Sequence, residues 1–165
     1  MRYQVQRGRV EVKARSSLHD TTTVWAKLSG SIDFDPDARD GAQAEISVDM
    51  RSFDAGDRFK NWKIKSDLDP EGHHTATFRL TRFDQIAEPT AGNFEATAAG
   101  QLAWHGRSPD IKVKGKGKID RRAIDAQASF ELDVRTLGVA PPRFLMFKVE
   151  DVVLVQVTLF AVAVP

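Results

Sequence analysis

The stretch FEATAAGQLAWHGRSPDIKVKGKGKI, residues 94–119, sets the architecture of this 165-residue chain. In its first half, residues of one parity from Phe94 to Trp104 are apolar or small, and most of their neighbours are polar. In its second half, apolar residues and glycines from Ile111 to Ile119 alternate with lysines. A period of two is typical of strands with one buried face. The turn-rich residues 105–110 join the halves, so the stretch predicts a hairpin.

Small residues occupy the inward row of this hairpin, where a filled core would carry Leu, Ile or Val. They are Ala96, Ala98, Gly100, Gly115 and Gly117. Glycine inside a strand usually marks a bulge or a close approach of two backbones. A cavity becomes the better explanation if other strands carry small inward residues as well.

Composition limits the classes of function. The length suits a single domain over residues 1–165. A net charge of +1 argues against a general nucleic-acid-binding surface, and the lack of cysteine excludes disulfides and thiol chemistry. The first residues lack the apolar segment of a signal peptide, and no apolar run reaches transmembrane length. We therefore expect a cytoplasmic protein, or a periplasmic one if a leader was removed.

The same alternation recurs along the chain. It predicts further strands at residues 3–14, 26–34, 42–51, 75–83, 124–135 and 149–164. Connections are expected at residues 18–23, 85–93 and 136–142, with a short apolar cluster at 143–147. Residues 57–68 predict a short helix. Its Phe59 and Trp62 are expected to plug one end of the sheet, with partner binding as the alternative.

Eight such strands predict an all-β protein, an eight-stranded antiparallel barrel with one or two short helices. A single open sheet of that width would curl and leave two exposed edges, whereas closure removes both. The interior of such a barrel is either filled by side chains or holds one small ligand. Inward alanines on several strands favour a hollow interior, and the nearly uncharged inward rows favour a long apolar guest. The predicted lining is Leu28, Ile32, Ala44, Ile46, Val48, Phe59, Trp62, Phe78, Leu80, Ala96, Ala98, Gly100, Leu102, Trp104, Val113, Gly115, Gly117, Ala126, Ala128, Phe130, Val153 and Val155.

Several segments resemble the YceI-like, polyisoprenoid-binding family. GQLAWHG at residues 100–106 is similar to the family's G-x-L-x-hydrophobic-H-G element. SSLH at 16–19 and LSGSI at 28–32 resemble its first hairpin, SFDAG at 52–56 precedes a short helix and HTATF at 74–78, and residues 148–159 resemble its last strand. The resemblance covers most of the chain in the family's order. It implies a lipocalin-like barrel whose apolar cavity holds an isoprenoid chain, such as a quinone tail or a polyprenyl lipid, often in a homodimer.

Two features depart from the family pattern. The family is largely exported, whereas this chain shows no leader. RSPD at residues 107–110 replaces the usual threonine-containing stretch after His-Gly.

Histidines are the candidates for polar chemistry. His105 and His19 lie at predicted strand ends or loops, where each is either a hydrogen-bonding turn residue or a base or headgroup ligand. His73 and His74 suggest a metal site, but adjacent strand residues point to opposite faces, so we expect no metal. No nucleophile-elbow pattern appears and no carboxylate pair stands out. We therefore expect no enzymatic activity.

The lysine row is the main charged feature. Lys112, Lys114, Lys116 and Lys118, continued by Arg121 and Arg122, either attract phosphate headgroups, an anionic membrane or nucleic acid, or form a solvated face that guards a sheet edge. The last strand is the candidate for a dimer contact or for closure onto the first.

These observations predict a non-enzymatic protein that binds, transports or sequesters a long-chain isoprenoid. We expect no cofactor and no nucleic-acid partner, with peripheral membrane contact and a homodimer as further expectations. The alternative is a stress-response or interaction module whose barrel is filled by side chains and acts through its surface. A third hypothesis is a lipid-headgroup hydrolase or isomerase, which requires His105 or His19 at the mouth beside a carboxylate.

Overall fold

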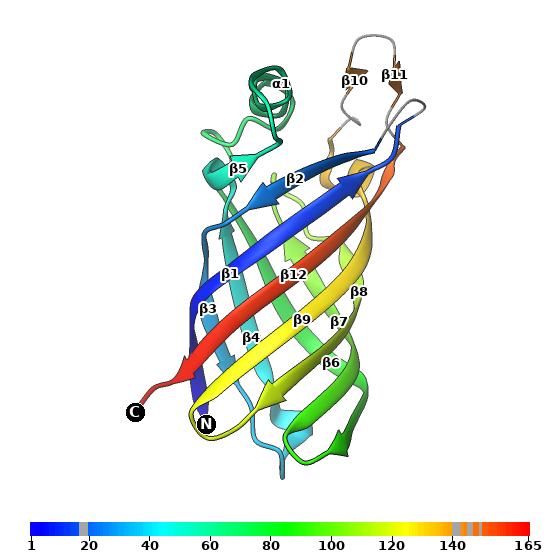
Figure 1. The fold of residues 1–165 in the computed structure, drawn as a ribbon. Helices are drawn as coiled ribbons and strands as arrows, with labels where there is room; N and C mark the ends of the chain where they lie inside the picture. The colour runs from blue at the N-terminus through cyan, green and yellow to red at the C-terminus, as the bar shows by residue number, and fades with distance from the viewer. Residues whose placement is uncertain (17–19, 140–142, 145–146, 149) are drawn as a thin grey trace.

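A closed barrel forms the body of the molecule (Figure 1), shown by a computed structural model that describes residues 1–16, 20–139, 143–144, 147–148 and 150–165. Eight antiparallel strands follow one another around it in the order β12-β9-β8-β7-β6-β4-β3-β1, and β1 pairs again with β12. The strands are β1 (Arg2–Ala14), β3 (Leu28–Asp33), β4 (Gln43–Asp49), β6 (Thr75–Thr90), β7 (Asn93–Ala103), β8 (Asp110–Ile119), β9 (Ala123–Asp133) and β12 (Val152–Ala163). The predicted barrel is confirmed.

Both chain termini lie at one end of the barrel, which we call the terminus end, and the only α-helix of the described residues lies at the other, the helix end (Figure 1). The helix end also carries four short strands and two 3-10 turns. They are β2 (Thr21–Trp25), β5 (Phe53–Asp54), β10 (Arg143–Phe144), β11 (Phe147–Lys148), η2 (Met50–Ser52) and η3 (Val134–Leu137). The turn η1 (Arg39–Gly41) follows β3. Of the predicted apolar cluster 143–147, residues 145 and 146 lie outside the described residues.

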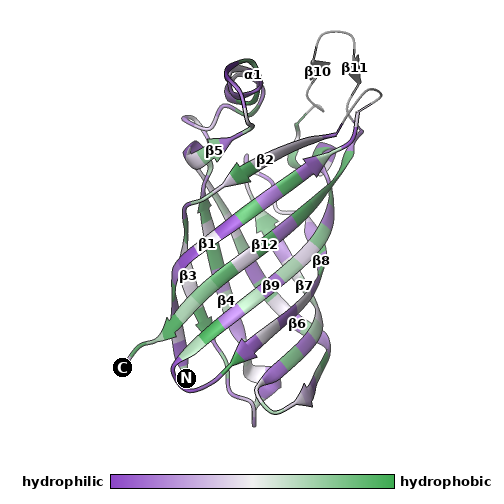
Figure 2. Ribbon diagram, viewed as in Figure 1, coloured by the Kyte–Doolittle hydropathy of each residue, from purple (hydrophilic) through white to green (hydrophobic). Residues whose placement is uncertain are grey.

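Apolar and polar residues alternate along the barrel strands (Figure 2). The lysine row lies on the outer face of β8, where all four lysines are exposed. Because β8 pairs with β7 on one side and β9 on the other, the row does not guard a sheet edge, and that part of the prediction is wrong.

Strand β6 is longer than its sequence pattern predicts. Its pairing with β7 shifts register between Leu80 and Arg82, between Phe83 and Gln85, and between Ala87 and Thr90. Each shift inserts residues that interrupt the alternation while the strand continues. The connection predicted at residues 85–93 is therefore wrong, since only residues 91 and 92 separate β6 from β7.

Strand β2 falls partly in a segment predicted as a polar connection. Thr21, Thr23 and Trp25 are buried and Thr22 is exposed, so threonines occupy the inward positions of a half-buried strand. Threonine is β-branched and favours strands, but its hydroxyl made the segment look like a loop. β2 pairs with the β1 residues nearest the helix end and β3 with those nearest the terminus end, so β2 and β3 share the flank of β1.

The last strand closes the barrel. β12 pairs with β1 from Tyr3 opposite Ala163 to Lys13 opposite Leu154. Of the two roles predicted for this strand, closure onto the first strand is the one that the structure shows.

Helix α1 (Arg58–Leu68) confirms the predicted helix. The Asp57 carboxylate accepts a hydrogen bond from the Lys60 backbone amide at 2.8 Å and caps its first turn. Its last turn ends at Asp69, whose φ of 45° is left-handed. Among the residues that the structure describes, no helix has the length and apolarity that crossing a membrane requires.

Candidate functional site

A packed aromatic cluster closes the barrel at the terminus end. Phe34, Phe94 and Tyr3 are each at most 5% exposed, and Phe83 packs beside them. The Phe34 ring meets that of Phe94 edge-on at a centroid distance of 5.3 Å and that of Phe83 at 6.4 Å. The Tyr3 hydroxyl donates to the Asp120 carbonyl at 2.7 Å, and burial raises the pKa of that phenol. We call these four residues the aromatic plug.

An apolar cavity of about 330 Å³ occupies the part of the barrel between the plug and the helix end. Every residue that lines it is apolar, and side chains of different strands face one another across it. Leu68 of α1, and Leu137 and Val139 at and after the end of η3, cover it at the helix end. The remaining lining residues are Val10, Val12, Trp25, Leu28, Ile32, Ala44, Ile46, Val48, Met50, Ala76, Phe78, Leu102, Trp104, Val113, Ala128, Phe130, Leu132, Val134, Val153, Val155, Val157 and Leu159.

The structure brings together most, but not all, of the predicted lining. Leu28, Ile32, Ala44, Ile46, Val48, Phe78, Leu102, Trp104, Val113, Ala128, Phe130, Val153 and Val155 line the cavity. Leu80, Ala96, Ala98, Gly100, Gly115, Gly117 and Ala126 do not, and neither do Phe59 and Trp62. The cavity is therefore displaced toward the helix end relative to the hairpin that suggested it.

The small residues of the β7–β8 hairpin make room for protein atoms. A β-carbon on Gly100 would overlap the ring of Phe78, and one on Gly117 would lie 3.3 Å from the Ala126 β-carbon. Ala98 pairs with Phe83 of the aromatic plug. Close approach thus explains Gly100 and Gly117, whereas Ala44, Val113 and Ala128 are among the residues that line the cavity.

Phe59 and Trp62 do not plug the barrel, so the expected position of these two side chains is wrong. They are 49% and 63% exposed, and their ring centroids are 6.2 Å apart. At about 100° per residue, they lie on the side of α1 opposite Ile64 and Leu68. Ile64 is buried and Leu68 lines the cavity, so the helix packs through its aliphatic residues rather than its aromatic ones.

Sequence reasoning missed lining residues of two kinds. Val10, Val12, Met50, Ala76, Leu132, Val157 and Leu159 share the inward parity of their strands and follow directly from the alternation. Val134 shares that parity too, as the last inward residue of the predicted strand 124–135, and Leu68 follows the spacing of the predicted helix. Trp25, Leu137 and Val139 lie on β2 and in the segment after β9. No period marks these three residues, because their position depends on how the short elements fold over the barrel end.

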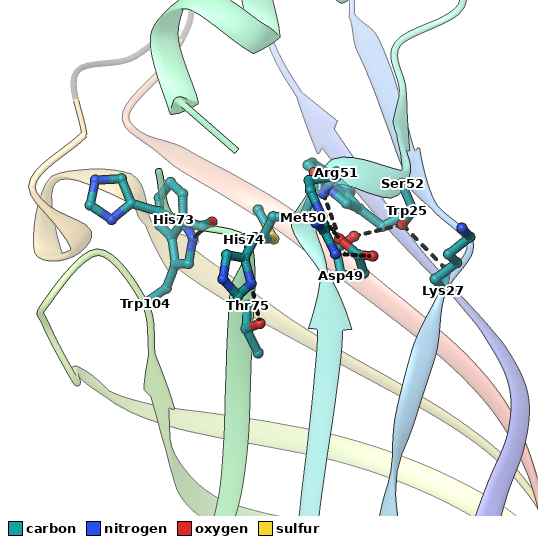
Figure 3. A network of polar contacts seen from close by, with 10 residues as sticks. All are labelled: Trp25, Lys27, Asp49, Met50, Arg51, Ser52, His73, His74, Thr75 and Trp104. Carbon is teal, nitrogen blue, oxygen red and sulfur yellow. Dashed lines mark hydrogen bonds and ion pairs between the residues drawn. The ribbon is translucent and has the colours of Figure 1, made fainter. Parts of the chain in front are cut away.

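Two tryptophans form hydrogen bonds with the backbone at the helix end of the cavity, which we call its rim (Figure 3). The indole of Trp25 donates to the Met50 carbonyl at 3.2 Å, and that of Trp104 donates to the His73 carbonyl at 2.8 Å. The Met50 amide donates in turn to the His74 carbonyl at 2.8 Å. Both indole rings line the cavity and are at most 6% exposed. Each indole therefore offers its apolar ring to the cavity while its polar N–H is satisfied by the rim backbone.

Charged groups at the rim are paired and lie outside the cavity. Hydrogen bonds from Arg51 hold the pKa of the Asp49 carboxyl below its ordinary value of 3.8. Arg135 does the same for Asp133 and also lies 3.5 Å from Asp151. The rim is thus ionised, whereas the wall below it carries no titratable group.

His105 occupies a tight turn at the rim. It has a φ of 56° and Gly106 one of 73°, and Trp104 and Arg107 exchange backbone hydrogen bonds of 2.9 and 3.0 Å around them. Its ring lies 4.0 Å from that of His73 and 5.1 Å from that of Trp104. Within the described residues it thus packs on aromatic rings as part of a turn. His19 lies outside the described residues.

The histidines that the structure describes at the rim form no metal site. His74 is exposed, and its ring contacts the Thr75 hydroxyl at 2.9 Å (Figure 3). Among the residues that the structure describes, no group of three or more His, Cys, Asp or Glu side chains is placed to hold a metal ion.

Comparison with known proteins identifies the family of this barrel. The family model described as the YceI-like domain matches residues 3–161. The chain belongs to the YceI-like family. No curated protein sequence matches this YceI-like chain.

Solved structures share the YceI-like barrel at low sequence identity. BcnA of Burkholderia cenocepacia is 21% identical, with a TM-score of 0.73 over 95% of this chain and 96% of that one. A polyisoprenoid-binding domain from Saccharophagus degradans, implicated in plant cell wall breakdown, is 15% identical, with a TM-score of 0.73 over 98% of both chains. The Campylobacter jejuni YceI protein is 13% identical, with a TM-score of 0.65 over 87% of this chain and 85% of that one. At these identities the likeness concerns the fold.

Proposed function

We propose that the protein is a non-enzymatic carrier that binds the tail of an isoprenoid or a related amphiphile inside its barrel. The observation that carries the proposal is the cavity of about 330 Å³ with an entirely apolar wall. Membership of the YceI-like family and the fold shared with a polyisoprenoid-binding domain support the same ligand class.

The energetics suit a ligand without polar anchors. Each isoprene unit removes about five carbons from water, and burial contributes roughly 0.8 kcal/mol per CH₂-sized group. Ordering a flexible chain offsets part of that gain. A tail therefore binds through apolar contact alone, and specificity comes from the length of the cavity and from its rim.

The size of the cavity limits how much of a chain it holds. Ligand pockets span roughly 300–1,000 Å³, so this one lies at the small end. The aromatic plug blocks further penetration. A long chain would accordingly place one portion in the cavity and leave the remainder outside at the helix end.

The alternative of a filled barrel fits only the terminus end. There the plug and its neighbours fill the interior, whereas the part toward the helix end is hollow. A surface-acting module does not explain why that hollow is bounded by apolar residues from eight barrel strands, α1 and η3.

Native mass spectrometry of the purified protein, followed by organic extraction and lipid analysis, tests the proposal. We expect a bound mass that extracts as a prenyl lipid or fatty amphiphile, or uptake of the prenyl alcohol farnesol by the empty protein. A mass that stays that of the bare chain after incubation with farnesol would contradict the carrier function.

A further inference from the structure

Helix α1 has two unlike faces at the covered end of the cavity. Ile64 and Leu68 point inward, one buried and the other lining the cavity. Phe59 and Trp62 point away from the barrel and expose about half or more of their surface. Two large aromatic side chains exposed side by side on one helical turn are unusual on a soluble surface, where such patches mark contact sites.

Cations flank this aromatic pair. Arg58 and Lys65 lie on one side of it around the helix, and Lys63 lies on the other. Residues 57–68 carry two more cations than anions, although the whole chain has a net charge of only +1. Lys63 pairs with Asp67 at 3.2 Å and Lys60 approaches Asp57 at 3.9 Å, whereas Arg58 and Lys65 are exposed. Positive charge is thus concentrated around the aromatic rings.

Exposed tryptophan and phenylalanine beside Lys and Arg are typical of protein surfaces that meet a membrane interface. The aromatic rings enter the headgroup region, and the cations attract anionic lipids. A second copy of this chain would present the same cations to this face, so like charges would oppose that contact. An anionic bilayer supplies both the apolar depth and the opposite charge.

We propose that α1 docks the protein on an anionic membrane surface through Phe59 and Trp62, with Arg58 and Lys65 as its electrostatic contacts. This inference rests on the proposed carrier function, because it places the covered end of the cavity against the source of an apolar ligand. The short hairpin β10–β11 lies at the same end (Figure 1).

Trp62 is a built-in reporter for this docking. It is 63% exposed, whereas Trp25 and Trp104 are 5% and 6% exposed. Adding vesicles of phosphatidylcholine and phosphatidylglycerol to the empty protein should therefore shift the emission of Trp62 to shorter wavelength. The variant Trp62→Phe should bind the same vesicles without that shift.

Vesicle flotation separates the aromatic and the charged contributions. The double variant Phe59→Ser, Trp62→Ser should lower the fraction bound by about tenfold or more, because two apolar side chains no longer leave water. Arg58→Glu with Lys65→Glu should weaken binding about fivefold or more per reversed cation. Lys114→Glu with Lys116→Glu is the matched control, since it changes the net charge equally on the outer face of β8 and should leave binding nearly unchanged.

Three outcomes would overturn the inference. They are wild-type protein that does not float with anionic vesicles at low salt, binding that the β8 reversal abolishes and the α1 reversal spares, and a dimer that the Phe59→Ser, Trp62→Ser variant dissociates in the absence of vesicle binding. Circular dichroism confirms that each variant is folded.

Farnesol uptake is measured separately in the same variants and should not change, because Phe59 and Trp62 do not line the cavity. If farnesol fails to bind while vesicles bind through α1, the carrier function fails and the docking surface stands. If farnesol binds and vesicles do not, the reverse holds.

Discussion

Gly100 lies where the interior leaves no room for a β-carbon. A β-carbon there would overlap the ring of Phe78 and lie 2.6 Å from the Arg79 carbonyl oxygen. We expect Gly100→Ala to lower the free energy of unfolding by about 1–3 kcal/mol, since overpacking forces the ring or the backbone to move. Urea denaturation measures the loss.

Two further variants make that result interpretable. Adding Phe78→Leu to Gly100→Ala should recover part of the lost stability, because leucine leaves more space for the new β-carbon. The recovery should be only partial, because the close contact with the Arg79 carbonyl oxygen remains. Gly41→Ala, where a β-carbon meets nothing within 4 Å, should change stability little. Equal stability of Gly100→Ala and the wild type would show that the ring is not confined as described.

Ala128 sets the width of the cavity. Its side chain lines the wall, while that of its neighbour Gln127 lies on the outer face of the same strand. Ala128→Phe should occupy part of the 330 Å³ and weaken farnesol uptake at least about tenfold, whereas Gln127→Phe should not. Isothermal titration measures both. Undiminished uptake by a folded Ala128→Phe variant would place the ligand elsewhere.

Among the elements, the loop after β3 contributes the centre of the aromatic plug. Phe34 is 4% exposed and meets the rings of Phe83 and Phe94. Phe34→Ala should cost about 3–5 kcal/mol of stability, because it leaves a void among packed rings. Thermal and urea unfolding measure it.

The control for that prediction is a phenylalanine on the outer face of the barrel. The ring of Phe160 on β12 is only half-buried and stacks under the Arg7 guanidinium at 4.2 Å. Phe160→Ala should cost less, on the order of 1 kcal/mol. A similar cost for both variants would indicate that the plug is not tightly packed.

The elements also show how far the sequence predicts this molecule. Strict alternation on β4, β8 and β9, together with the apolar run of β12, was sufficient to predict the barrel and most of its inward rows. The alternation fails on β6, where Phe83 and Ile86 both pack inward because a bulge separates them. A bulge is a property of strand pairing, and one strand read alone does not reveal it.

The part of the candidate site that the barrel strands form was predictable from the sequence. The part formed by the short elements that cover the helix end was not. Helical spacing in α1 correctly predicted the helix, but it could not tell which face meets the barrel. The face that packs on the barrel is the one with Ile64 and Leu68, whose aliphatic side chains fit under the helix, while lysines surround the aromatic pair. Likewise, Leu137 and Val139 reach the cavity only through the turn η3.

For the whole molecule, acid is expected to weaken the fold. Arginine or lysine side chains or backbone amides lower the pKa values of five aspartates below 3.8: Asp33, Asp49, Asp84, Asp120 and Asp133. A carboxyl whose pKa is lower in the folded state contributes stability above its unfolded value, and that contribution disappears as the pH falls through the folded value. Stability should therefore decline below about pH 4.

Melting temperatures recorded between about pH 6 and pH 3 test this expectation. Since all five groups remain in contact with solvent, the decline should be modest and should shrink in high salt. A melting temperature that rises as these carboxyls are protonated would contradict the assignment of their pairs.

The aromatic plug closes the barrel at the terminus end, so a ligand can enter and leave only at the helix end. A chain that enters such a barrel goes in tail first and must come out headgroup first, along the route by which it arrived. Binding and release then use the same end of the barrel, so one ligand has to leave before the next can enter. Under the proposed carrier function, the protein would therefore not pass a lipid from one surface to another at its opposite end. Delivery would require it to detach, turn and present the same helix end to the recipient.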